Sequence, residues 1–415
     1  MYYQDINEQL HQKKMRNGLN LVIIPRNNYY KTEINLAVNF GSMHQSITNE
    51  KQSTTHDIPA GTAHFLEHMI FENSSPKWQD VMSSPNISIN ASTNFKRTSF
   101  TMSTIEGISS LIPILLDTVQ NISFSDLNLN KERKIISHEI NMYDNNIDWL
   151  SRIKLLNNMY SNPAFTKDIL GDAHSIKKID SKLLTMCHRH YYTPDNMILV
   201  ISGPVNTRNI LDLVESNTKN EVCDKRKHYT SNTLYEPLTV VKNLDVIKKG
   251  NEYKTLIGIK LIPLPYLDLL DFKLALEIYL YFLHKEIISI MHEYNFEINL
   301  ESSISKYFSN IIFIANTSKH EYVNYLLMTA KENLRKKKID EEQLLHVVQK
   351  KSGEILSNMN STNFLVKNYV NHYFEGVDFF NILDKLQNVQ LSDVLAIDNV
   401  MFHKNNKSIL LQKPE

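Results

Sequence analysis

The segment GTAHFLEHMIFE, Gly61 to Glu72, decides how the rest of this sequence is interpreted. It is helical in pattern, and residues three or four positions apart lie on the same face of a helix. His64 and His68 can therefore present their imidazoles to one ion, with Glu67 beside them. The order HxxEH is the reverse of the common HExxH zinc signature. Two helical histidines supply two of the three protein ligands of a catalytic zinc ion, so the third should come from elsewhere.

A second segment, KERKIISHEINMYDNN, offers carboxylates at helical spacing. Glu132 and Glu139 are seven positions apart and share one face of a helix. One could bind the metal while the other hydrogen-bonds a ligand. His138 projects about 100° away from Glu139 and is not expected to take part. On spacing alone, both the histidine pair and the glutamate pair could also be solvated helix faces.

The composition is that of an ordinary globular protein. The 415 residues carry a formal net charge of zero, with 42% hydrophobic and 22% charged residues. The length predicts two or three domains, and the neutral balance argues against a nucleic-acid-binding protein. Cys187 and Cys223 lie far apart, which predicts reduced thiols in a cytoplasmic protein. The N-terminal residues lack the apolar core of a signal peptide. The most apolar run, Leu256 to Leu283, is interrupted by charges, so no membrane span is expected.

Strand-like runs followed by helical runs occur twice along the chain, which predicts two related α+β domains. In the first half we expect strands at 19–24, 34–40, 87–93, 98–104 and 196–203, and helices at 61–72, 107–119, 129–156 and 181–191. In the second half we expect strands at 238–243, 254–263, 297–303, 307–316 and 408–412, and helices at 268–284, 321–337 and 341–356. The polar stretch between the halves predicts a linker at 217–236, which separates domains at 1–216 and 237–415.

The motifs together resemble those of the pitrilysin, insulysin and mitochondrial-processing-peptidase family. Its pattern is HxxEH, then some seventy residues, then Glu; here 70 residues separate His68 from Glu139. Asn90-Ala-Ser-Thr93 resembles the NAxT edge strand of the family. HYYTPDNMILVISG, residues 190–203, resembles the family's YxPxNMxLxxxG run. The length is similar to that of small bacterial members, which act in pairs.

The resemblance implies a fold and a set of roles. The fold would be α+β, with two related processing-peptidase-like (LuxS-type) domains, each a mainly antiparallel sheet covered by helices. His64, His68 and Glu139 would bind one Zn²⁺ ion per chain, Glu67 would be the catalytic base, and Glu132 would support a ligand. The substrate, an extended peptide, would pair with the strand that contains Asn90, Ala91, Ser92 and Thr93.

One departure from the family divides the possible functions. Active members need an Arg and a Tyr from the second half, and the corresponding run, Ile287 to Leu300, has no arginine and only Tyr294. His292 and Ile298 stand where the Arg and Tyr would be. The favoured hypothesis is a metal-bearing subunit of a heterodimer with a homologous subunit that lacks zinc. The alternatives are a self-sufficient homodimeric peptidase and a non-enzymatic structural subunit that retains a metal site. The complete set of site residues argues against the last.

Two other motifs have less specific interpretations. Cys187-His188-Arg189-His190 could indicate a metal or a nucleophile, but its place at a helix end favours packing. The run RKKK, Arg335 to Lys338, favours a solvated helix face over a site for an anionic partner.

Overall fold

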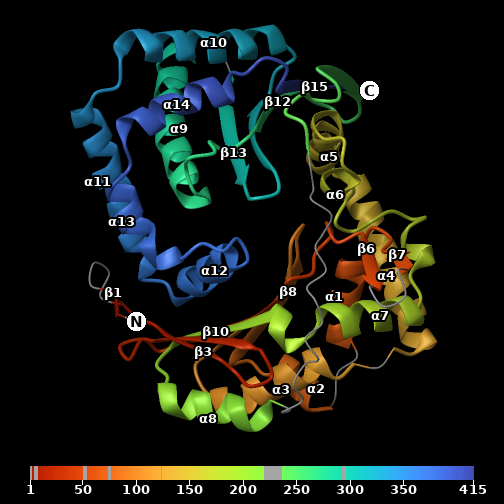
Figure 1. Cartoon of the computed structure of the whole chain (residues 1–415). Helices are drawn as coiled ribbons and strands as arrows, with labels where there is room; N and C mark the ends of the chain where they lie inside the picture. The colour runs from red at the N-terminus through yellow and green to blue at the C-terminus, as the bar shows by residue number, and fades with distance from the viewer. Residues whose placement is uncertain are drawn as a thin grey trace. The chain divides into compact units, whose positions relative to one another are not determined.

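The computed structural model of this chain describes residues 2–3, 8–49, 54–72, 76–122, 124–218, 236–291 and 296–415 (Figure 1). The described chain divides into two compact units, and each unit takes segments from both halves of the sequence. The first contains residues 1–142, 167–233 and 358–379, and the second contains residues 143–166, 234–357 and 380–415. The division into domains at 1–216 and 237–415 stays a prediction. These compact units are not continuous in sequence, so their boundaries differ from the predicted ones. Residues 219–235 of the predicted linker lie outside the described residues.

The first unit is built on a six-stranded sheet with the order β3-β4-β10-β5-β9-β8. Neighbouring strands are antiparallel except β4 and β10, which are parallel. The six strands are β3 (His11–Lys14), β4 (Asn20–Pro25), β5 (Thr32–Val38), β8 (Ile87–Thr93), β9 (Thr98–Thr104) and β10 (Met197–Gly203). Two small antiparallel pairs accompany them: β1 (Tyr2–Tyr3) with β2 (Glu8–Gln9), and β6 (Ser46–Asn49) with β7 (Thr54–Asp57).

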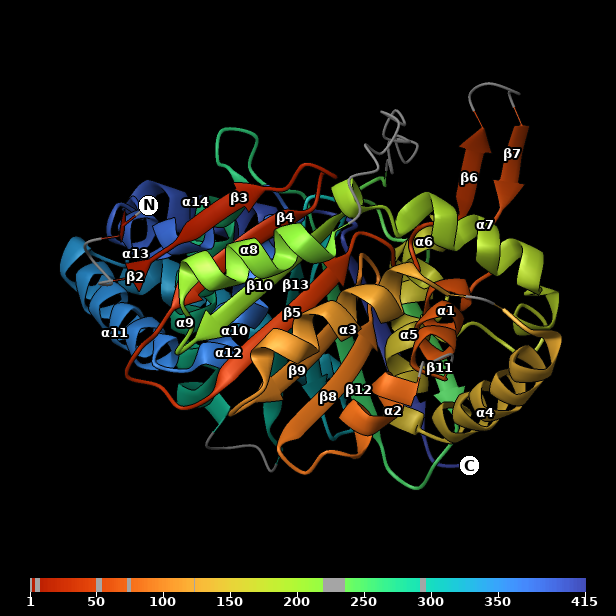
Figure 2. The same cartoon turned by 90° about the horizontal axis from the view of Figure 1, so that it is seen from below.

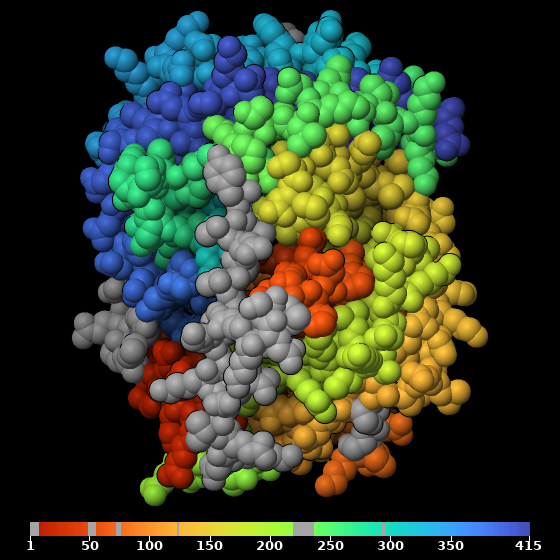
Figure 3. Space-filling view, turned by 45° about the vertical axis from the view of Figure 1, so that its right-hand side comes forward, coloured from red at the N-terminus to blue at the C-terminus, as the bar shows by residue number. Residues whose placement is uncertain are grey.

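Helices cover both faces of this sheet. The helices of this unit are α1 (Thr62–Glu72), α2 (Pro76–Ser83), α3 (Ile108–Gln120), α4 (Asp126–Asp144), α7 (Ser181–Tyr191), α8 (Thr207–Asn217) and α12 (Thr362–Tyr373). Helix α12 packs on β5 and β10, while α3 and α8 lie together on the opposite face (Figures 1 and 2). The β6–β7 hairpin lies beside α7 on the surface (Figure 3), where the Tyr191 hydroxyl donates to the Ser46 carbonyl at 3.2 Å.

The second unit repeats this plan with five strands in the order β11-β15-β12-β14-β13. Only β11 and β15 are parallel. The strands are β11 (Leu244–Lys248), β12 (Lys254–Leu261), β13 (Ile298–Ile304), β14 (Ser309–Ala315) and β15 (Lys407–Lys413). The helices are α5 (Ile147–Met159), α6 (Pro163–Thr166), α9 (Leu269–Met291), α10 (His320–Lys337), α11 (Glu341–Met359), α13 (Ile382–Gln387) and α14 (Leu391–Met401). Short 3-10 helices lie at Ile176–Lys178, Pro194–Asn196 and Phe379–Asn381 of the described chain.

The two sheets correspond strand by strand, with β4, β10, β5, β9 and β8 matching β11, β15, β12, β14 and β13. A pair of helices is exchanged between the halves. Helix α5, from the first half, packs on β12 and β15 of the second unit, and α12, from the second half, packs on β5 and β10 of the first. The α+β fold with two related, mainly antiparallel domains is therefore confirmed.

Most of the predicted elements form, and the exceptions have local causes. The predicted helix 129–156 is wrong as one element, because it is divided at Asn146, whose side chain caps α5 by accepting from the amides of Asp148 and Trp149. The predicted strand 238–243 is also wrong. There the Val240 amide donates to the Asn405 carbonyl, outside any sheet, and β11 begins at Leu244. Among the described residues, no helix is long and apolar enough to cross a membrane.

Candidate metal centre

Helix α1 is anchored at its start by a close backbone approach. Gly61 has φ +87°, and a Cβ at this position would lie 2.4 Å from the Leu170 carbonyl oxygen, so a residue with a side chain would not fit. One side of the helix then enters the core, with Phe65, Leu66 and Met69 fully buried. Since these residues fix the rotation of α1, they also fix the direction in which its polar side chains project.

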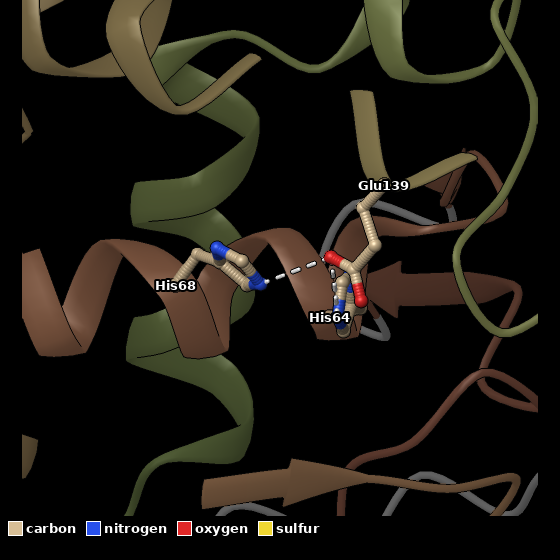
Figure 4. A group of neighbouring side chains, drawn as sticks. All are labelled: His64, His68 and Glu139. Atoms are coloured by element: carbon tan, nitrogen blue, oxygen red, sulfur yellow. Dashed lines mark ion pairs between the residues drawn. The ribbon is translucent and has the colours of Figure 1, made fainter. Parts of the chain in front are cut away.

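The polar side of α1 brings His64 and His68 together with Glu139 of α4 (Figure 4). Glu139 Oε2 lies 3.7 Å from His64 Nε2 and 3.6 Å from His68 Nε2. The ligand atoms of the three residues all lie within 4.8 Å of one another. Within the described part of the chain, no other group of three His, Cys, Asp or Glu side chains comes this close.

Glu132 contacts His68 on the ring nitrogen that faces away from Glu139. It lies two turns before Glu139 on α4, its side chain is 1% exposed, and its Oε2 is 3.2 Å from His68 Nδ1. A proton on Nδ1 donated to this carboxylate leaves Nε2, the nitrogen that faces Glu139, with a free lone pair. His64 has no such support: its buried Nδ1 has no hydrogen-bond partner among the described residues.

Glu67 is held by a hydroxyl group of a neighbouring strand. The Thr93 hydroxyl, at the end of β8, donates to Glu67 Oε2 at 2.5 Å. Thr93 Oγ1 lies 3.1 Å from Thr98 Oγ1, and the Thr98 hydroxyl also lies 2.9 Å from the Phe40 carbonyl oxygen. A short hydrogen bond to a carboxylate is strong, and it fixes the orientation of the Glu67 side chain.

Burial changes the ionisation of two groups at this site. It lowers the pKa of His64 to about 3, with a smaller contribution from His68. It raises the pKa of Glu67, while the hydrogen bond from Thr93 acts in the opposite direction. A neutral imidazole is the form that binds a metal ion, and a carboxylate with a raised pKa is a better acceptor for a proton from water.

The donor set fits zinc. Two imidazole nitrogens and one carboxylate oxygen form the His₂Glu combination found in catalytic zinc sites, which keep a fourth position open. Zinc–ligand bonds of about 2.0–2.1 Å in a tetrahedron place the ligand atoms about 3.3 Å apart. The Glu139 oxygen lies 3.7 and 3.6 Å from the two histidine nitrogens, a few tenths of an ångström longer. All three ligand atoms lie within 4.8 Å of one another, so the side chains would have to move closer together to hold an ion.

The four residues predicted to contact substrate lie on β8, an edge strand of the sheet. Their side chains alternate between the two faces: Asn90 and Ser92 are exposed, while Ala91 and Thr93 are half-buried. The side chain of Thr93 is directed at Glu67. This contact was not predicted from the sequence. The two-residue period of a strand places Thr93 and Asn90 on opposite faces, which is a signal that the two residues have different roles.

The other sequence motifs have structural roles or lie outside the described residues. His292 and Tyr294 lie outside them, and Ile298 begins β13 as a buried residue. Burial raises the pKa of Cys187 to about 12, which does not suit a nucleophile. His188 Nε2 lies 2.8 Å from the Val119 carbonyl oxygen, as expected for packing.

Comparisons with known proteins identify similar peptidases. Residues 21–173 match the family model described as Insulinase (Peptidase family M16). The chain is 28% identical to an uncharacterized zinc protease of Bacillus subtilis, YmfH, over 94% of both chains. It is 27% identical to the human mitochondrial-processing peptidase subunit beta, over 46% of this chain and 38% of that protein.

Solved structures share the fold over almost the full length. An M16-like peptidase from Alicyclobacillus acidocaldarius has a TM-score of 0.85 and 24% identity, over 98% of this chain and 99% of the other. An M16 domain from Pseudomonas fluorescens, described as inactive, has a TM-score of 0.79 and 12% identity, over 98% of both chains. The fold alone therefore does not establish catalysis, and the site residues must carry that argument.

Proposed function

Because residues 21–173 of this chain match the insulinase (M16) peptidase family, we propose that the chain is a zinc metalloendopeptidase that cleaves or matures short peptides. One observation carries the proposal: His64, His68 and Glu139 converge from two helices, with Glu67 held beside them by Thr93. A member of the fold without catalytic activity would not need these four residues and Glu132 in this arrangement. Burying these polar groups costs stability unless they are paired or bind a ligand.

The reaction would be hydrolysis of a peptide bond. His64, His68 and Glu139 would hold one zinc ion, which supplies Lewis acidity toward the scissile carbonyl and lowers the pKa of water. Glu67 would accept the proton of the attacking water and deliver it to the leaving amine. Thr93 would keep the Glu67 carboxylate oriented for both transfers. Glu132 would keep His68 in the tautomer that binds through Nε2.

The substrate would bind in an extended conformation along β8. An edge strand offers free backbone donors and acceptors, and a peptide that pairs with it is recognised mainly through its own backbone. Residues 90–93 end at Thr93, whose hydroxyl contacts Glu67. A peptide paired with this part of β8 would therefore reach the candidate centre. Recognition of this kind tolerates many sequences.

We also propose that the chain works as the metal-bearing subunit of a heterodimer. Family members often act as heteromeric subunits, and one relative is itself named a subunit. The run from Ile287 to Leu300 has no arginine, and the buried Ile298 offers no phenol. A homologous subunit without the HxxEH motif would supply the Arg and Tyr for the substrate. A self-sufficient homodimer is the second candidate. Cytoplasmic localisation is part of the proposal, from the reduced thiols that the sequence predicts.

The test is Glu67→Gln in chain purified by affinity tag from its own cells, together with any subunit that accompanies it. Glutamine keeps the shape and the hydrogen bond from Thr93 but cannot take a proton. We expect cleavage of a quenched peptide library to fall by about 10²- to 10⁴-fold, with zinc unchanged at about one per chain by elemental analysis. Glu277→Gln on α9 is the matched control, because Glu277 is a partly exposed helical glutamate of the second unit.

Each outcome decides a separate point. Undiminished cleavage by Glu67→Gln would refute the role of Glu67. Zinc without cleavage in a monomeric recombinant chain, and cleavage when a homologous subunit co-purifies, would support the heterodimer. Chelator-sensitive cleavage by a homodimer of the recombinant chain would refute the heterodimer and support the self-sufficient enzyme.

A further inference from the structure

The second unit leaves open a place that the first unit fills with a helix. In the first unit, α8 lies beside α3 over β10 and β4 (Figure 2). It buries Ile210 and Val214, and its Glu215 pairs with Lys13 of β3 at 3.0 Å. The counterparts of α3, β10 and β4 in the second unit are α10, β15 and β11. The described residues of the second unit contain no counterpart of α8.

An apolar groove occupies the corresponding place beside α10. It has a volume of about 470 Å³ and is lined by α10, the end of α14 and the strands β11, β12 and β15. Its apolar lining includes Leu244, Ile259, Leu327, Met328, Met401 and Ile409. Leu244 is 46% exposed and Met328 is 37% exposed, so apolar side chains that would be covered in the first unit meet solvent here.

The charge of the groove is one-sided. Its ionisable lining residues are His320, His403, Lys404 and Lys407, and no carboxylate lines it. Lys407 is half-buried and donates to Asn324 Oδ1 at 2.5 Å, and no carboxylate of the described residues pairs with it. Burial lowers the pKa of Lys407, because it removes water from the ammonium group.

We propose that this groove docks an amphipathic helix of a partner protein, with an apolar stripe over Leu244 and Met328 and an acidic residue at Lys407. The internal duplication supplies the shape of the occupant, since α8 covers the equivalent face of the first unit. The charge of the groove supplies the acidic flank. Residues 219–235 of this chain are a poor occupant, because that stretch has more basic than acidic residues.

The probe is a synthetic peptide of residues 206–218, the sequence of α8 with its cap. It carries Ile210 and Val214 on one side and the acidic residues Asp212 and Glu215. The full-length chain is labelled with ¹³C at the methionine methyl groups, and the peptide is titrated up to millimolar concentration. We expect saturable shifts of the Met328 and Met401 signals, while Met142, an exposed methionine on α4, stays unchanged.

Charge variants separate specific docking from general hydrophobic adhesion. Lys407→Glu should weaken the peptide by about fivefold or more, and Lys413→Glu, at an exposed position of the same strand, should not. A peptide with Asp212→Asn and Glu215→Gln should lose affinity for the wild-type chain.

Three results would overturn the proposal. The first is the absence of methyl shifts at Met328 and Met401 at millimolar peptide. The second is equal affinity for the acidic and the neutral peptide. The third is a dependence of these shifts on protein concentration without peptide, which would make a second copy of this chain the occupant.

Discussion

The helices that follow corresponding strands in the chain differ between the units: α1 and α2 come between β5 and β8, whereas α9 comes between β12 and β13. Helix α1 directs His64 and His68 toward Glu139, and Glu67 toward Thr93. Helix α9 is longer and buries leucine, phenylalanine and isoleucine along most of its length. The same strand order therefore supports a polar site in one unit and a hydrophobic core in the other, so the chemistry depends on few side chains.

The two units also differ in the second helix after β9 and the second helix after β14. Helix α4 of the first unit brings Glu132 and Glu139 to the site, whereas its counterpart α11 brings no carboxylate close to a histidine pair in the described residues. In the first unit, polar groups are buried in a cluster that hydrophobic residues would stabilise better. The arrangement is what a site selected for function, at some cost in stability, would show.

The largest effect should follow from removing one of the three converging side chains. His68→Ala should lower zinc affinity by more than the roughly 10- to 100-fold that loss of a supporting residue costs. His284→Ala on α9 is the matched variant in the second unit and should keep zinc. Competition with a chelator of known affinity measures both. Equal zinc binding by wild type and His68→Ala would show that the ion binds elsewhere and would remove the difference between the units.

Glu132→Gln should have the next largest effect. The amide can still contact His68 Nδ1, but it removes the negative charge that supports the imidazole, so zinc affinity should fall by about 10-fold. Glu139→Gln removes the converging oxygen itself and should cost more. If the order of these two variants were reversed, Glu132 would be the direct ligand and Glu139 the supporting residue.

Thr93→Val should lower catalysis without removing zinc. The substitution keeps the size of the side chain and deletes the hydroxyl that donates to Glu67. A hydrogen bond to a charged group contributes about 1.5–3 kcal/mol, so kcat should fall by about 10-fold or more with KM little changed. Thr93→Ser should restore most of kcat. A rise in KM with kcat unchanged would instead indicate that Thr93 acts only through substrate binding, as the sequence alone predicts.

The sequence signals for the candidate site are local. The spacing of His64, Glu67 and His68 follows from one helix, and Glu132 and Glu139 follow from another. The pairing of the two helices comes from the family resemblance, and the structure brings the same residues together. The role of the Thr93 hydroxyl could not be assigned, because Thr93 meets Glu67 through a contact between β8 and α1.

The division into units could be predicted only in part, because it depends on tertiary packing. The Asn145-Asn146 pair is a helix-capping signal inside the predicted helix 129–156, and it marks the start of α5. No local pattern shows that α5 then packs on β12 and β15, or that α12 packs on β5 and β10. Amphipathic helices of similar composition can cover either sheet, so only the whole fold decides.

The smallest expected effect concerns α5 and α12, the two exchanged helices. Both begin at a residue whose side chain caps the helix. Asn146 accepts from Asp148 and Trp149 amides at the start of α5, and Ser361 accepts from the Phe364 amide at the start of α12. Replacing either cap by alanine should cost about 1 kcal/mol. The two tryptophans report on different units, because Trp78 lies in α2 and Trp149 lies in α5.

Urea unfolding in single-tryptophan backgrounds should therefore separate the two caps. Asn146→Ala should lower the midpoint seen by Trp149 more than the midpoint seen by Trp78, and Ser361→Ala should do the reverse. Assignment by sequence half predicts a different result. Asn146, Trp78 and Trp149 all come from the first half of the chain, so Asn146→Ala would lower both midpoints, and Ser361→Ala, in the second half, would lower neither. Equal losses at both probes would mean that the units unfold as one body, and the helix exchange would then link the two sheets into a single cooperative structure.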